Sequence, residues 1–145
     1  EAIKRLSDIP RNRVKAEFVA KVIRPFLQDP HPYPRGRAVI ALGNLLKEKA
    51  IPDIVKLAGD QKESRYKLEF QDPDGEADFT EDWTFSWGRV DEAVVRKIAA
   101  ITFDKPYSFN LGPIFYETRA EDIEREAGLV QAWYEKNRET LENRE

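Results

Sequence analysis

Acidic side chains crowd one short stretch of the chain, QDPDGEADFTED at residues 71–82. Carboxylates at alternate positions around a glycine can converge on a calcium ion, which prefers several oxygen ligands. This stretch lacks the full twelve-position ligand series that ends in a bidentate glutamate. We therefore interpret it as a solvated acidic turn and expect no bound metal. Its weak candidate ligands are Asp72, Asp74, Glu76 and Asp78.

Residues capable of nucleophilic or acid–base chemistry are few. The chain has no cysteine, which excludes cysteine nucleophiles, thiolate metal sites and disulfides. Its one histidine, His31, stands between two prolines, and no serine lies in a nucleophile-elbow pattern. The seven glycines are scattered, so a glycine-rich phosphate loop is also excluded. We expect no catalytic residue and no cofactor.

Charge is distributed unevenly along the chain. Residues 1–50 carry 11 Lys/Arg against 5 Asp/Glu, whereas the 145-residue chain as a whole has a net charge of −3. A basic N-terminal surface could bind nucleic acid or another polyanion, although the acidic total weighs against non-specific binding. The basic candidates for a binding surface are Arg13, Lys21, Arg24 and Arg37.

Aromatic residues alternate with polar ones on both sides of the acidic stretch. Trp83, Phe85 and Trp87 follow a period of two, which is typical of a strand. We predict strands within about 65–71 and 82–88, forming a β-hairpin insertion at 61–89. One aromatic face either packs over the helices or stays exposed as an anchor for a partner.

The remainder of the chain has the apolar period of amphipathic helices. We predict helices at about 13–28, 35–47, 50–58, 91–103 and 120–141, with a kink or an early end at Pro25. Val14, Phe18, Val22 and Phe26 form the expected buried stripe of the first helix. The predicted core comprises Val22, Val39, Leu42, Leu46, Ile54, Leu57, Val94 and Ile98.

Two segments share a recurrent pattern of small residues, prolines and charges. The longer reads Asp29-Pro30-x-Pro32-x-x-Arg35-x-x-Ala38-x-x-Ala41-Leu42-Gly43-x-Leu45, then Ala50-Ile51-Pro52-x-Ile54-x-x-Leu57-x-x-Asp60, and the shorter reads Asp91-x-x-x-Val95-Arg96-x-x-Ala99. The pattern resembles repeats of the HEAT family, close to its bacterial lyase-type HEAT-like subgroup. The match is good at 29–60 and partial at 91–103. The resemblance implies a structural ladder in which Arg35 and Arg96 lie near Asp29, Asp60 or Asp91.

Together these features predict a mainly α, single domain over residues 1–145. Its class would be a short HEAT-like, armadillo-type α-solenoid of antiparallel helix pairs, with the inserted two-stranded β-hairpin and a capping C-terminal helix at 120–141. We expect a non-catalytic scaffold that binds another protein. The alternatives are a polyanion-binding protein and a lyase-type or glycosylase-type HEAT-like enzyme. No stretch is apolar enough to span a membrane, and the absence of methionine suggests a processed form or a fragment.

Overall fold

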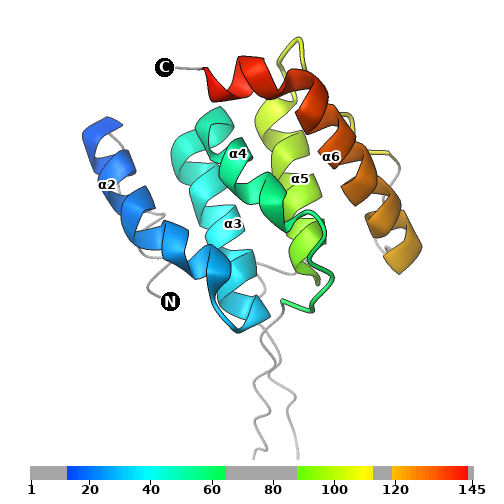
Figure 1. Ribbon diagram of the computed structural model, residues 1–145, viewed down its shortest axis with the longest axis horizontal. Coiled ribbons are helices and arrows are strands. Elements are labelled where there is room, and N and C mark those ends of the chain that lie inside the picture. The colour runs from blue at the N-terminus through cyan, green and yellow to red at the C-terminus, as the bar shows by residue number, and fades with distance from the viewer. Residues whose placement is uncertain (1–12, 65–87, 113–118, 144–145) are drawn as a thin grey trace, which may run out of the picture.

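The computed structural model describes residues 13–64, 88–112 and 119–143, and these residues are mainly helical (Figure 1). Helix α2 (Arg13–Ile23) passes into the 3-10 helix η1 (Arg24–Gln28), and α3 (Pro32–Leu46) into η2 (Lys47–Ala50). Then follow α4 (Ile51–Ile54), η3 (Val55–Leu57), α5 (Val90–Thr102) and α6 (Ala120–Glu142).

Prolines set several of these boundaries. The predicted early end of the first helix at Pro25 is confirmed, since α2 ends at Ile23 and η1 contains that proline. Helix α3 begins at Pro32, where the missing amide hydrogen costs no helical hydrogen bond. It ends before Lys47, whose positive φ of 54° redirects the chain into η2.

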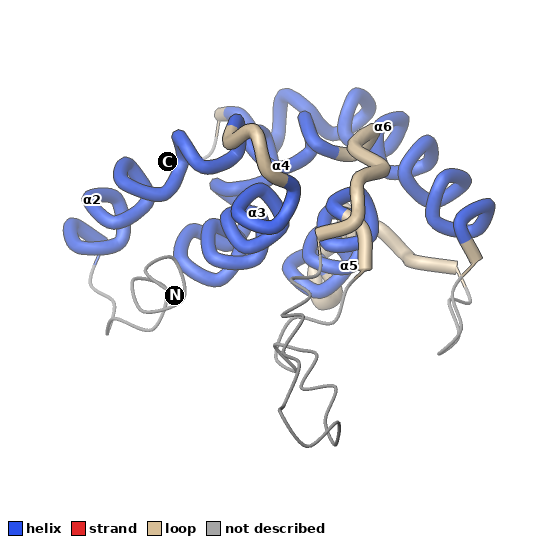
Figure 2. Tube along the Cα trace, turned by 90° about the horizontal axis from the view of Figure 1, so that it is seen from below, coloured by secondary structure: helices blue, strands red, loops and turns tan. Residues whose placement is uncertain are grey.

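The helices form two layers (Figures 1 and 2). Helices α2, α4 and α6 lie in one layer, and α3 and α5 lie side by side in the other. Helix α3 contacts α2, α4 and α5, whereas α6 packs against α5 and α4. The core lies between the layers, where Leu42 and Ile54 are fully buried.

Most of the predicted core residues are confirmed as buried: Val39, Leu42, Leu46, Ile54, Val94 and Ile98. Leu57 is partly buried against the same cluster. The prediction is wrong for Val22, which is 45% exposed, and for Phe18, which is 70% exposed. The buried side of α2 consists instead of Ala16, Val19, Ala20 and Ile23.

The connection after α5 packs into the body through polar anchors. The hydroxyl of buried Thr102 donates to the carbonyl of Ile98 at 2.8 Å and accepts the amide hydrogen of Phe109 at 3.0 Å. The Phe109 ring meets that of Trp133 edge-to-face, with 6.0 Å between centroids. The Trp133 indole N–H donates to the carbonyl of Tyr107 at 2.7 Å, which fixes this connection against α6.

The fold class predicted from the sequence needs correction. The described residues contain helices and no β-strand, and their one isolated β-bridge joins Glu63 to Arg89. Around this bridge, the amide of Ser64 donates to the carbonyl of Gly88 at 2.7 Å. The paired segment contains too few residues to form a β-ladder. The predicted strands lie almost wholly within 65–87, outside the described residues.

The solenoid prediction is not confirmed either. A solenoid stacks structural units of similar size. Here α4 has 4 residues and continues as a 3-10 helix, whereas α6 has 23 residues. The described helices therefore do not recur as units of equal size. They form two layers instead.

Candidate functional site

Of the predicted ladder residues, Arg35 lies at the start of α3 against two of its expected neighbours. Its Nε and one terminal nitrogen donate to the Asp60 carboxylate at 2.6 and 3.3 Å. Its other terminal nitrogen donates to the backbone carbonyl of Asp29 at 2.8 Å. Arg35 thus bridges the chain before α3 and the chain after η3, which is a structural role.

Arg96 occupies a different setting from Arg35. It pairs with Glu92, one turn earlier in α5, at 3.0 Å. Asp91 pairs with Arg89 at 2.7 Å, and that guanidinium also lies 3.5 Å from Glu124 of α6. Burial raises the pKa of Asp91, and the hydrogen bonds from Arg89 oppose the rise. The Arg96–Glu92 pair lies within one helix, whereas Arg89 connects the start of α5 to α6.

The predicted basic surface is not brought together. Lys21 is exposed on α2, but Arg24 pairs with Asp53 at 3.0 Å and lies 3.9 Å from Glu17. Arg37 is only 4% exposed and its guanidinium lies 5.3 Å from the centre of the Tyr33 ring. The side chain of Arg13 lies outside the described part. No continuous basic face is therefore formed by Lys21, Arg24 and Arg37.

Two other groups of predicted site residues cannot be placed. The acidic candidates Asp72, Asp74, Glu76 and Asp78, and the aromatic candidates Trp83, Phe85 and Trp87, all lie outside the described residues. Within the described ranges, no three His, Cys, Asp or Glu side chains are grouped so that they could hold a metal ion. His31 is exposed before α3, and its backbone amide donates to the carboxylate of Asp29 at 2.9 Å.

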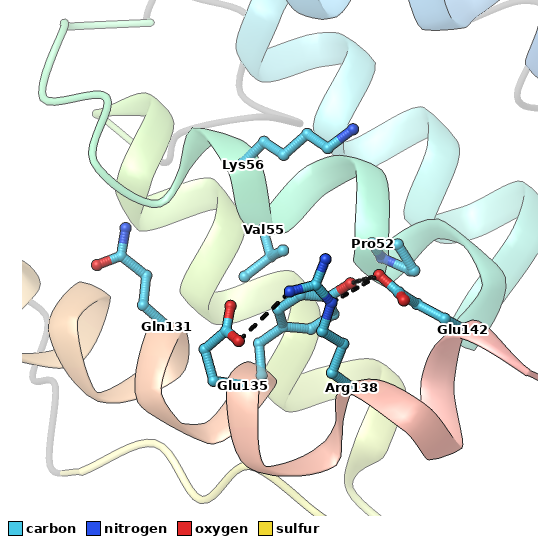
Figure 3. Close-up of a pocket in the computed structure, with 8 residues that line it drawn as sticks. Pro52, Val55, Lys56, Gln131, Glu135, Arg138 and Glu142 are labelled. Carbon is cyan, nitrogen blue, oxygen red and sulfur yellow. Dashed lines mark hydrogen bonds and ion pairs between the residues drawn. The ribbon is translucent and has the colours of Figure 1, made fainter.

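A surface cleft of about 490 Å³ separates the α4–η3 segment from the C-terminal half of α6 (Figure 3). We call it the α4–α6 cleft. Helix α6 supplies one wall because its buried stripe, which includes Val130 and Tyr134, packs toward the body and leaves the neighbouring polar residues at the rim. The cleft is lined by Pro52, Val55, Lys56, Gln131, Tyr134, Glu135, Arg138 and Glu142.

The charged groups on the α6 wall satisfy one another. The Tyr134 hydroxyl donates to Glu142 at 2.6 Å, and Arg138 donates to the same oxygen at 3.2 Å. Arg138 also lies 3.5 Å from Glu135, and Figure 3 shows it between the two carboxylates. Burial, followed by the hydrogen bond to Glu142, raises the pKa of Tyr134 to about 12. The same bond, with help from Arg138, lowers the pKa of Glu142.

This arrangement gives the cleft little reactivity. Tyr134 retains its proton well above neutral pH and therefore cannot serve as a base there. The guanidinium of Arg138 is shared between two carboxylates. On the opposite wall, Lys56 extends along the rim and also lines a smaller hollow of about 220 Å³ beside η1. The α4–α6 cleft is a structured groove with internally paired charges.

A different feature marks the outward side of α2. Phe18 is 70% exposed and Val22, one turn later, is 45% exposed, so the two side chains form one apolar strip that we call the α2 ridge. Single exposed apolar residues are common on protein surfaces. Phe103, directly after α5, is 85% exposed, and Leu129, on α6, is 51% exposed. Among these four large exposed residues, only Phe18 and Val22 share a helix face.

Comparison with known proteins leaves the site to be interpreted from its own geometry. No protein-family model, curated protein or solved structure matches the chain. None of the described helices combines the length and apolar character needed to cross a membrane.

Sequence reasoning assigned the α2 ridge to the core, although a signal for its exposure was present. Apolar residues occur on two sides of α2, because Val19 and Ile23 face the body while Phe18 and Val22 face solvent. A helix at the edge of a fold can bury only one of two such sides within its own domain. The second apolar side, with Phe18 and Val22, is therefore left exposed.

Proposed function

We propose that this chain is a non-catalytic protein-interaction module that receives a helix of another protein along the α2 ridge. The observation that carries this proposal is the exposure of Phe18, 70%, and Val22, 45%, one turn apart on one helix. Large aromatic anchors at an exposed site supply most of the binding energy in many interfaces.

The position of α2 in the fold supports a helix as the docked element. Helix α2 lies at one end of its layer and is supported on one side by α3 and η1 (Figure 1). Side chains one turn apart form a ridge that fits between the side chains of a second helix. A partner helix along α2 would extend the layer in which α2, α4 and α6 lie.

A displayed library of amphipathic helical peptides with randomised sequences tests the proposal. The library is selected on the full chain, and the selected peptides are measured by calorimetry against Phe18→Ser and against Leu129→Ser. Leu129 is a matched control because it is also exposed, 51%, but lies on α6. We expect binding that Phe18→Ser weakens by about tenfold or more and Leu129→Ser leaves unchanged.

Two results would overturn the proposal. One is that selection on the full chain enriches no peptide beyond the level found in a parallel selection on the Phe18→Ser variant. The other is a set of peptides whose affinity responds to Leu129→Ser and ignores Phe18→Ser. Both substitutions are at exposed positions, and circular dichroism melting verifies that both variants remain folded.

A further inference from the structure

We draw no further inference here: the strongest candidate, the cleft of about 490 Å³ between the α4–η3 segment and α6, identifies no ligand, because the charged side chains of its α6 wall pair with one another and, within the described part of the chain, no buried polar group without a partner lines it.

Discussion

Arg35 at the start of α3 and Asp60 after η3 are joined by two hydrogen bonds, of 2.6 and 3.3 Å, between side chains that are each 14% exposed. The same guanidinium donates to the carbonyl of Asp29. The amide of Asp91 in turn donates to the backbone carbonyl of Asp60 at 2.8 Å. The chain segments before α3, after η3 and at the start of α5 are therefore connected through this pair.

We expect Arg35→Ala to lower the free energy of unfolding by about 1.5–3 kcal/mol, because the largely buried Asp60 carboxylate loses its charged donor and keeps only the amide hydrogen of Lys62, at 3.1 Å. Arg35→Lys should recover only part of the loss, since lysine lacks the planar fork that binds both oxygens. Urea denaturation measures both changes. As a control, Arg125→Ala removes a pair with Asp122 and a 4.0 Å contact with Glu126 from a 53% exposed site and should cost less than Arg35→Ala. Equal losses would contradict the bridging role of Arg35.

Leu42 lies fully buried in α3, between the two layers. Leu42→Ala should lower the free energy of unfolding by about 2–5 kcal/mol, through lost burial and the cavity that remains. Leu129→Ala makes the same chemical change at a 51% exposed position and should change stability little. Thermal unfolding of both variants provides the comparison, and similar midpoints would mean that Leu42 does not belong to the core.

The helices of this fold could be predicted from the sequence because their signals are local. The period of apolar residues located α3 and α5, and the predicted C-terminal helix at 120–141 is close to the observed Ala120–Glu142. Pro25 indicated an early end of α2, because proline lacks the amide hydrogen that the helix interior needs for its hydrogen bonds. Local patterns also identified six core residues of α3, α4 and α5 correctly.

The candidate surfaces depend on which side of a helix faces the body, and that choice is not local. Helix α2 buries Ala16 and Ala20 with Val19 and Ile23, so its smaller residues face α3 and the larger Phe18 remains outside. Hydrophobicity alone favours burying the larger side chain. The α4–α6 cleft could not be predicted for a similar reason, because it joins Val55 to residues about 80 positions later in the chain.

The pKa of Tyr134, raised to about 12, leads to a titration experiment. The absorbance of ionised phenol should show a late transition near pH 12 that is missing in Tyr134→Phe. Glu142→Gln should lower the pKa of Tyr134 only in part, because burial is the larger cause and remains. If Glu142→Gln left the late transition unchanged, the contribution of the hydrogen bond would be refuted.

The same groups determine how stability should depend on pH. The pKa of Tyr134 is higher in the folded protein than the value of 10.0 for an unperturbed tyrosine, so its contribution is complete below pH 10 and is lost as pH rises toward 12. The pKa of Glu142 is lowered, so its contribution is present above 4.5 and is lost as pH falls through the folded value. Tyr134→Phe should flatten the alkaline decline between pH 10 and 12, measured by urea denaturation.

Gly36 and Gly128 both lie within helices but should respond oppositely to alanine. A Cβ at Gly36 would lie 2.8 Å from the Cβ of Ser64, whose backbone is held by the bond to Gly88, so the contact cannot relax by a side-chain rotation. A Cβ at Gly128 on α6 would meet no atom within 4 Å.

Alanine gains up to about 1 kcal/mol over glycine in a helix interior. Gly128→Ala should therefore stabilise the protein by about 0.5–1 kcal/mol, whereas overpacking at Gly36→Ala should outweigh that gain and destabilise it by about 1–2 kcal/mol. Urea denaturation of the two variants measures both signs, and a stabilising Gly36→Ala would show that α3 does not pack directly against Ser64.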